Sequence, residues 1–473
     1  MWSIPEAPEG ALFVRIAAMF ADHIRRGALR AGDRLPSTRL IARQLRVNRN
    51  TIVAAYDDLA AQGWVVARGP AGTYVANEMP DRAPRRAPPA GMAARTAFEL
   101  RVVPAVPSLD PGGCRYLMSV GVPDTRLVPR DALARAYRRA LHARSTRSAL
   151  DYGDPRGTEQ LRGAIAAMLR EQRAVPVGAD NILVTHGSQM ALDLAARLLL
   201  RPGDVAAVEE LGYPPAWRAL ANAGAELAPV PLDDAGLKVE ALGVPRLVYV
   251  TPHHQYPTTV LLSPARRLAL LELARTRGFA IVEDDYDHEF HFEGRPVAPL
   301  ASIDRGATVL YIGSFSKLLA PGLRLGYIAA CERVIERLAT LRSSIDRMGD
   351  QVLEHAVAEL IEDGELRRHA RKARRAYAAR REAMASLLAR ELGGALTVRL
   401  PPGGITLWAK VAPDVRLDAW RERARAHGVA IATARQFDLN ARPRPYLRLA
   451  YAYHDESELA DAIRRLRKAL AEA

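Results

Sequence analysis

The chain has 473 residues, 49% of them hydrophobic and 25% charged, which is long enough for two or three globular domains with a large core. Its two cysteines, Cys114 and Cys331, exclude a disulfide framework, and its first apolar run is broken by Arg15, unlike a signal peptide. No apolar stretch is long enough to cross a bilayer, so we expect a cytoplasmic protein. The net charge of +14 permits a nucleic-acid partner, although an arginine-rich composition alone gives the same charge.

Residues 1–77 are predicted to form a small domain of three helices and a hairpin. In the first helix Leu12, Ile16, Phe20 and Ile24 recur every four residues, which indicates one apolar face, and Gly27 closes the helix. The segment "STRLIARQL" is the second helix, with a serine at its start that can cap it.

The third helix follows the tight turn "RVNRN", where Asn48 can act as its cap. Ile52, Tyr56 and Leu59 then face inward. The helix start is rich in Arg, Asn and Thr, side chains that reach base edges in a major groove while backbone amides face phosphate. "WVVARGPAGTYVA" is predicted to be a two-stranded wing with Arg68 at its turn. By periodicity alone, any small three-helix bundle with a hairpin fits equally well.

The stretch "GDRLPSTRLIARQLRVNRNTIVAAYDDLAAQGWVVARGPAGTYV" resembles the winged helix-turn-helix domain of GntR-type regulators. The likeness lies in LPS-R, A--L-V-R-T, AY--L---G and the G-T-V ending, whereas Ala71 departs from the small polar residue often found in the wing turn. The resemblance implies double-stranded promoter or operator DNA as a partner. It gives as candidate DNA contacts Arg34, Arg39, Arg49, Asn50, Thr51 and Arg68.

Residues 78–112 accumulate Pro, Arg, Ala and Gly without apolar periodicity, which predicts a semi-extended linker. In residues 113–473 short apolar runs alternate with helical stretches, so we expect a mainly parallel sheet covered by helices on both faces. The predicted strands are 182–185, 205–208, 247–250, 280–282 and 309–312.

Lys317 stands in "YIGSFSKLLAPGLRLGY", on the loop after an apolar run, and is one of only five lysines in an arginine-rich chain. A lysine amine becomes a Schiff-base nucleophile when it loses its proton, which a guanidinium does not do. A solvated loop lysine is the ordinary alternative, so the residues around this position decide its role.

The segment "FAIVEDDYDHEF" supplies an acid and a phenol. An apolar strand ends at Val282, and Asp284 follows at the carboxyl end, where α/β sheets bind ligands. An acid there would keep the pyridine nitrogen of pyridoxal phosphate protonated, and Tyr286 on the same side could hydrogen-bond the phenolic oxygen of the ring. A solvated acidic loop is the alternative. We expect no metal, because oxygen ligands and imidazoles are mixed without a recognised spacing among Asp284, Asp285, Asp287, His288, Glu289 and His291.

The phosphate group of such a cofactor needs backbone amides and a cation. "ILVTHGSQMALDLAARLLL" is predicted to be a strand, a turn and a helix whose amino end is an anion site, although GSQ alone is a common helix start. A guanidinium and two hydroxyls from the lysine loop can add to it, and a tyrosine in "ELGYPP" could stack on the ring. The candidates are Gly187, Ser188, Gln189, Ser314, Ser316, Arg324 and Tyr213.

From about residue 115 to the carboxyl terminus the chain resembles fold-type I aminotransferases, which implies a three-layer α/β/α large domain and a smaller α+β domain. By that resemblance Lys317 is the catalytic lysine that forms the internal aldimine, Asp284 is the pyridinium partner and Tyr286 is the donor to the phenolic oxygen. The phosphate cup is then formed by Arg324 with Ser188, Gln189 and Ser314.

Two further residues take roles from the same resemblance. Tyr152, in "DYGDPRGTEQLRGAIA", corresponds to a tyrosine that reaches the phosphate of the neighbouring subunit, so we expect a homodimer. Arg448, in "YLRLAYA", corresponds to the arginine that binds a substrate carboxylate, the alternative being a surface arginine on a strand. One departure is Tyr256 in "HHQYPTT", where the family often has the Asn of Asn-Pro-Thr-Gly.

A GntR-like winged helix, a linker and an aminotransferase-like domain together resemble the MocR regulators. The resemblance implies a transcriptional regulator that senses an amine, an amino acid or pyridoxal 5′-phosphate itself through aldimine chemistry. A working aminotransferase with a DNA-binding appendage is the main alternative. A protein that has lost the cofactor is disfavoured, because Lys317, Asp284 and Arg324 all remain.

Overall fold

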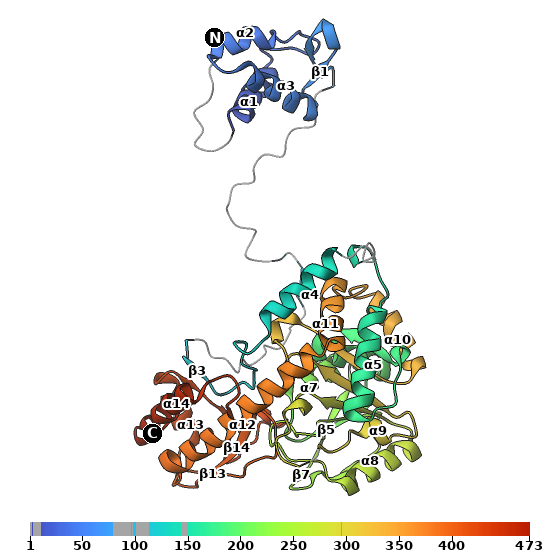
Figure 1. The fold of residues 1–473 in the computed structure, drawn as a ribbon, viewed down its shortest axis with the longest axis vertical. Coiled ribbons are helices and arrows are strands. Elements are labelled where there is room, and N and C mark those ends of the chain that lie inside the picture. The colour runs from blue at the N-terminus through green and yellow to red at the C-terminus, as the bar shows by residue number, and fades with distance from the viewer. Residues whose placement is uncertain are drawn as a thin grey trace. The chain divides into compact units, whose positions relative to one another are not determined.

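The computed structural model describes residues 2, 11–78, 96, 98–100, 113–142, 149–294 and 296–473. The chain divides into two compact units, Met1–Ala105 and Val106–Ala473 (Figure 1). The predicted linker, 78–112, lies almost entirely outside the described residues. No described helix is both long enough and apolar enough to cross a membrane.

The first unit is a winged helix, as the sequence predicts. Its elements are α1 (Leu12–Arg25), α2 (Thr38–Leu45), α3 (Arg49–Ala61), β1 (Val65–Ala67) and β2 (Thr73–Val75). The two strands pair antiparallel, with Val65 opposite Val75. The core combines side chains from the helices and the wing, among them Ile16, Phe20, Ile24, Ile52, Leu59 and Val75.

Leu12 is 39% exposed, so its predicted place on the buried face of α1 is wrong. A row spaced by four residues drifts around a helix that repeats every ~3.6 residues, and Leu12 lies about 120° away from Ile24. Phe13, about three whole turns before Ile24, packs against the core instead.

Both predicted caps are present. The Ser37 hydroxyl accepts a hydrogen bond from the backbone N–H of Leu40 at 3.3 Å, and the Asn48 side chain accepts one from the N–H of Asn50 at 2.9 Å. Between them Arg46 adopts a left-handed conformation with φ 55°, which ends α2 and turns the chain into α3. The cap therefore fixes where the exposed first turn of α3 begins.

The second unit is built on a seven-stranded sheet with the order β4-β12-β11-β10-β9-β5-β6. All neighbours from β11 to β6 are parallel, whereas β12 runs antiparallel to both β4 and β11. The strands are β4 (Ile182–Thr185), β5 (Val205–Glu209), β6 (Glu226–Val230), β9 (Leu247–Val250), β10 (Ala280–Asp285), β11 (Val309–Ser314) and β12 (Gly326–Ala329).

The sequence prediction omitted β6 and β12 and ended β10 too early. β6 contains Pro229 and lies at the edge of the sheet, where a missing N–H is tolerated. β12 is a short strand that begins with a glycine, and β10 continues through Asp285 because acidic residues at its end remain paired with β11. Asp284 is therefore the penultimate residue of the strand and does not follow it.

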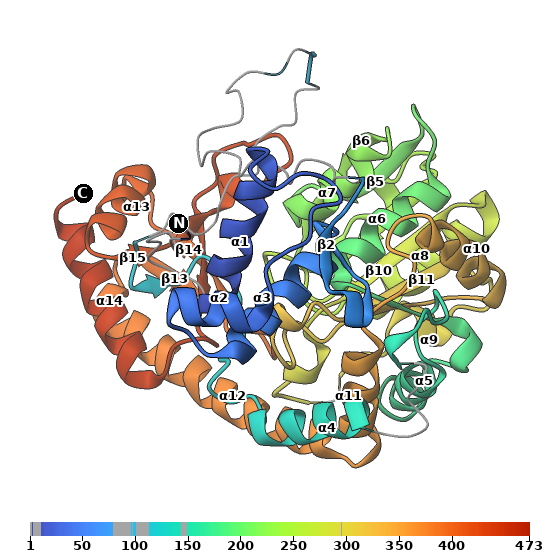
Figure 2. The same ribbon diagram turned by 90° about the horizontal axis from the view of Figure 1, so that it is seen from above.

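Helices cover both faces of the sheet, as predicted (Figure 2). Along β9, Leu247 and Tyr249 enter one hydrophobic core, while Val248 and Val250 enter the other. The first core is closed by α6 (Gly187–Leu199), α7 (Pro214–Asn222) and α10 (Glu332–Ser343). The opposite face is covered by α5 (Glu159–Arg173), α8 (Pro264–Arg277) and α9 (Leu300–Ile303).

A smaller α+β domain completes the unit. Its sheet has the order β13-β14-β17-β16, and α12 (Glu365–Leu392) packs against both α11 and α14 (Figure 1). β3 (Tyr116–Leu117) pairs with β15 (Val429–Ala430), which ties the start of the unit to its end. The remaining elements are α4 (Arg130–His142), α11 (Gln351–Glu362), α13 (Leu417–Ala426), α14 (Glu456–Ala471), β7 (Leu232–Asp233), β8 (Gly236–Leu237), β13 (Leu396–Val398), β14 (Thr406–Val411), β16 (Ala432–Thr433) and β17 (Tyr446–Ala450).

The cap of α3 yields a stability prediction. Asn48→Ala removes the acceptor for the N–H of Asn50 and should destabilise the winged helix by about 1 kcal/mol. Hydrogen exchange of the full chain should become faster in the winged helix and stay unchanged in the second unit. Gln44→Ala, at an exposed position of α2 with no cap role, is the control, and equal exchange in both variants would contradict the cap.

Candidate functional site

Lys317 lies in the turn after β11, and its Nζ donates a hydrogen bond to the carbonyl oxygen of Gly121 at 2.7 Å. The residue as a whole is partly buried, but its amine is withdrawn from water. That desolvation, reinforced by the guanidinium of Arg448, lowers the pKa of Lys317 to about 8, against the opposing pull of Asp287 and Asp284. A large share of this amine is therefore neutral, and nucleophilic, in mildly alkaline solution.

Asp284 is 4% exposed, and its Oδ2 accepts a hydrogen bond from the Tyr249 hydroxyl at 2.9 Å. Burial raises the pKa of Asp284 to about 7, and the hydrogen bond from Tyr249 opposes that rise. Its other oxygen, Oδ1, is buried without a hydrogen-bond partner among the described residues. A buried acceptor left without a donor fits a ligand that brings one, such as a protonated ring nitrogen.

Three tyrosines form one aromatic cluster beside this carboxyl. The Tyr286 hydroxyl donates to the carbonyl oxygen of His254 at 3.0 Å. Tyr256 meets the ring of Tyr213 at 5.2 Å between centroids and that of Tyr286 at 6.1 Å, both in edge-on geometry. Burial raises the pKa of Tyr213 to about 12, so its hydroxyl stays protonated. The cluster is a preformed apolar wall with hydroxyls at its margins.

Some of the predicted phosphate residues come together where β4, β12 and β11 lie side by side. Ser314 pairs with Gly326, which in turn pairs with Thr185 just before the start of α6. The Ser314 hydroxyl accepts from the backbone N–H of Ser316 at 3.1 Å. Gln189, by contrast, donates its side-chain amide to the carbonyl oxygen of Pro215 at 3.1 Å, which turns that group toward α7.

Gly187 and Arg324 meet at the amino end of α6. Gly187 has φ +75°, and a Cβ added there would meet guanidinium atoms of Arg324 at 3.0 to 3.2 Å. Arg324 is exposed and donates to the carbonyl oxygen of His186 at 3.1 Å. Ser188, partly buried, is the next residue of the helix. Helix amides, a guanidinium and hydroxyls at one edge are the donor set that suits a phosphate dianion.

Arg448 is 2% exposed in β17, so the alternative of a surface arginine is wrong. Its guanidinium donates to the carbonyl oxygen of Ser119 at 3.3 Å and lies 4.5 Å from the ring centroid of Tyr256. Its Nε is buried without a hydrogen-bond partner among the described residues, and none of their carboxylates lies within ion-pair distance. A buried cation without a counter-ion fits an anionic ligand.

Two parts of the site were not foreseen from the sequence. Tyr249 stands in an otherwise aliphatic strand, a position where its hydroxyl signals a buried acceptor, here Asp284. Tyr256 was noted only as a departure from the family motif, yet its ring stacks against Arg448 and contacts two other tyrosines.

Tyr152 stands apart from the other predicted residues. Its side chain is 78% exposed, and the guanidinium of Arg347 lies 4.4 Å from its ring centroid. No hydrogen bond or ring contact within the described chain joins it to Lys317, Asp284 or Arg324.

The predicted DNA-contact residues line the outer surface of the winged helix. Arg34, Arg39, Arg49, Asn50 and Arg68 are exposed, and Thr51 is partly exposed. The Arg49 Nε donates to the Thr38 hydroxyl at 3.4 Å, and Arg68 lies over the ring of Tyr74 at 4.9 Å. The first turn of α3 and the wing therefore both present cations.

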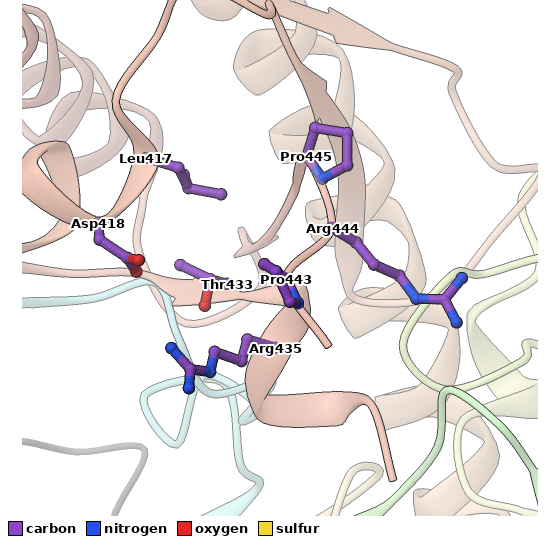
Figure 3. A pocket seen from close by; sticks show the side chains of 7 residues that line it. All are labelled: Leu417, Asp418, Thr433, Arg435, Pro443, Arg444 and Pro445. Atoms are coloured by element: carbon purple, nitrogen blue, oxygen red, sulfur yellow. The ribbon is translucent and has the colours of Figure 1, made fainter. Parts of the chain in front are cut away.

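A separate cavity of about 290 Å³ lies in the smaller domain, between the start of α13 and the segment before β17 (Figure 3). Arg444 at its margin is already held by Asp438 at 2.8 Å and by Glu210 at 2.7 Å. None of the predicted site residues lines this cavity.

The chain is similar to known proteins over both units. Residues 117–466 match the family "Aminotransferase class I and II", and residues 12–75 match "Bacterial regulatory proteins, gntR family". The probable rhizopine catabolism regulatory protein MocR of Rhizobium meliloti is 34% identical over 449 residues, 94% of this chain and 90% of that protein. The HTH-type transcriptional regulator TauR of Rhodobacter capsulatus is 34% identical over 477 residues, 98% of this chain and 97% of that one.

Among solved structures, the α-aminoadipate aminotransferase LysN of Thermus thermophilus, complexed with N-(5′-phosphopyridoxyl)-L-leucine, superposes with a TM-score of 0.70 at 29% identity. The match covers 76% of this chain and 93% of LysN. Pyridoxal 5′-phosphate is the cofactor of this fold, and the unpaired Asp284 oxygen, the Lys317 amine and the donor edge at α6 fit it.

A GntR-type winged helix and a class I and II aminotransferase domain in one chain define a DNA-binding transcriptional regulator with a pyridoxal phosphate domain. The sequence similarity extends across both parts. The chain belongs to the MocR subfamily of GntR-type regulators.

The lowered pKa of Lys317 predicts its pH dependence. Labelling of the cofactor-free protein with an amine-reactive anhydride, quantified by peptide mass spectrometry, should rise with pH and reach half its maximum near pH 8 at this residue. The shift is downward, so the reactive neutral amine is present above that pH and lost below it. Arg448→Gln removes a cation that lowers the pKa and should move the midpoint upward; a wild-type midpoint above pH 10 would contradict this.

Proposed function

We propose that this regulator senses a small molecule carrying both a primary amine and a carboxylate, and that the ligand binds between Lys317 and Arg448. The observation that carries the proposal is the pair of groups itself. The partly neutral amine of Lys317 shares its site with the buried guanidinium of Arg448, which has no counter-ion among the described residues. An amino-acid-type effector supplies the missing anion and an amine of its own.

Pyridoxal phosphate, when bound, supplies an aldehyde that condenses with primary amines and a ring that withdraws electrons. Lys317 is the residue that would hold the aldehyde carbon, because its pKa of about 8 leaves a neutral fraction available for attack. The effector amine and the Lys317 amine would be alternative partners for that aldehyde. When it is not joined to the cofactor, the Lys317 amine can donate a hydrogen bond to the carbonyl oxygen of Gly121.

Asp284 would hold the proton on the ring nitrogen. Its pKa of about 7 leaves it only partly ionised, and a cationic ring nitrogen beside Oδ1 would favour the carboxylate. Tyr249 keeps the other oxygen in place through its hydrogen bond. Tyr286 and Tyr213 would contact the ring, the first through its hydroxyl and the second through its face.

The phosphate group would bind at the start of α6, with Ser188, Ser314, Ser316 and Arg324 as donors. Gly187 supports this assignment, because a side chain there would displace the Arg324 guanidinium. Gln189 would have to leave the Pro215 carbonyl to take part. Tyr152, exposed and without a ligand contact in its own chain, suits the role of a donor to a second copy, so the proposal includes a homodimer.

Regulation requires that the effector bind one state of the protein better than another, since equal affinity shifts no equilibrium. In this proposal residues 113–473 form the sensing domain, and 78–112 link it to the DNA-binding domain 1–77. DNA affinity and effector affinity then change each other by the same factor. We also propose a cytoplasmic location, because a regulator of this kind binds chromosomal DNA.

Full transamination is the second candidate activity. It is favoured by the completeness of the lysine, aspartate and arginine set, and disfavoured by Tyr256, whose ring packs on Arg448 where the family often has an asparagine. Conversion of an amino donor to its keto acid without any effect on DNA binding would support this activity in place of sensing.

Lys317→Ala tests the sensing mechanism. The variant should lose covalent cofactor attachment, assayed by borohydride reduction and peptide mapping, together with the response of DNA binding to a panel of amino acids and amines. The DNA for this assay is a duplex selected from a random-sequence pool for binding to the full-length protein. The variant should keep its basal affinity for that duplex. Lys372→Ala, at an exposed lysine, is the matched control, and an unchanged effector response in Lys317→Ala would refute covalent sensing.

Arg49→Ala tests the DNA-binding surface. Removal of this exposed cation from the first turn of α3 should weaken binding to the selected duplex about 10-fold or more, because both phosphate and base-edge contacts depend on it. Cofactor uptake should not change. Arg43→Ala, an exposed arginine of α2 outside the predicted contacts, is the control; equal gel-shift affinities for the two variants would mean that the recognition surface lies elsewhere.

A further inference from the structure

Three buried histidines meet beside the site described above. His253 and His254 follow β9, whereas His291 comes after β10 and forms an antiparallel bridge with Gly403. The three side chains belong to residues that are 2%, 1% and 6% exposed. One ring nitrogen from each lies within 4.8 Å of the other two. Sequence spacing gave no sign of this, because two separate segments contribute.

The nitrogens at this meeting point lack partners. Both nitrogens of His253, Nε2 of His254 and Nδ1 of His291 are buried and accept or donate no hydrogen bond within the described chain. Neutral imidazoles offer lone pairs, and several unpaired ones at a single point call for a shared ligand.

Asp287 sets the orientation of one ring. Its Oδ1 lies 2.7 Å from Nδ1 of His254, so that nitrogen donates to the carboxylate and Nε2 carries the lone pair. A carboxylate behind a histidine is the arrangement that orients metal-binding imidazoles and raises their basicity. Asp287 also places a carboxylate next to the three rings.

Gly403 packs closely against the ring of His254, and a side chain at this position would collide with Nε2. A Cβ on Gly403 would lie 2.8 Å from that nitrogen and 2.5 Å from the carbonyl oxygen of Phe290. His288, the nearest other histidine in this segment, is instead directed to Asp285, with its Nδ1 3.6 Å from Oδ2.

We propose that His253, His254 and His291 bind one divalent transition-metal ion of the Zn²⁺ class, with a fourth position open to water. Three nitrogens without sulfur or carboxylate ligands favour Zn²⁺, Co²⁺, Ni²⁺ or Cu²⁺ over Mg²⁺ and Ca²⁺. Nitrogens about 2 Å from a tetrahedral ion lie roughly 3.3 Å apart, so small side-chain rotations close the site. This replaces the expectation of no metal.

The test uses the full-length protein, stripped with EDTA and titrated with Zn²⁺ against a competing chromophoric chelator. We expect one ion per chain at micromolar or lower dissociation constant, and a visible spectrum of four-coordinate Co²⁺ when Co²⁺ replaces Zn²⁺. His291→Phe, close in volume, should weaken binding on the order of 100-fold or more. Asp287→Asn, which keeps all three ligands, should weaken it about 10- to 100-fold.

His288→Asn is the matched control, a buried histidine of the same segment outside the triad, and should bind like the wild type. Circular dichroism and cofactor uptake verify the fold of each variant. If folded wild-type protein takes up no Zn²⁺ or Co²⁺, or if His291→Phe binds as tightly as wild type, the proposal is overturned. If the variants fail to fold, X-ray absorption of the Co²⁺-loaded wild-type protein tests the proposal instead. A six-coordinate ion bound by a single imidazole would also overturn the proposal.

Discussion

The site in the large unit depends on two cationic groups, the amine of Lys317 and the guanidinium of Arg448, which lie in one region withdrawn from water. Two cations at close range in a medium of low dielectric repel each other strongly, and only the lysine can relieve the repulsion by losing its proton. Burial lowers the pKa of Lys317 to about 8, repulsion from Arg448 adds to that fall, and Asp287 and Asp284 oppose it. The site is therefore poised for a ligand that brings an anion to Arg448 and a reactive carbon to Lys317.

The large sheet positions the segments that carry the groups of this site. β12 runs antiparallel between β4 and β11, and Gly326 brings the three backbones close together. A Cβ on Gly326 would lie 3.0 Å from backbone atoms of Gly187 and from the carbonyl oxygen of Gly313. The start of α6 and the end of β11 consequently reach the same edge, and the donors that we propose for a phosphate are held there by the sheet.

Local chemistry explains what the sequence predicts well. Asn48 caps a helix through an atom two residues away, and Gly187 starts α6 directly after a strand, so both follow from short segments. The stacking of Tyr256 on Arg448 and the pairing of Tyr249 with Asp284 join residues far apart in sequence, and no local pattern encodes them. The sequence prediction missed β6 and β12 for a related reason. Their short segments become strands only through pairing with neighbouring strands of the sheet.

His254 connects the two halves of the polar interior. Its carbonyl oxygen accepts a hydrogen bond from the Tyr286 hydroxyl at the proposed cofactor site, while its ring, held by Asp287, is one of the three histidine rings of the triad. Asp287 also acts on the charge states of both Lys317 and Asp284. A cation on the triad adds positive potential to the same network, which favours the neutral form of Lys317 and the ionised form of Asp284. Those are the forms that bind pyridoxal phosphate, so metal and cofactor would strengthen each other's binding, and by linkage they would do so equally.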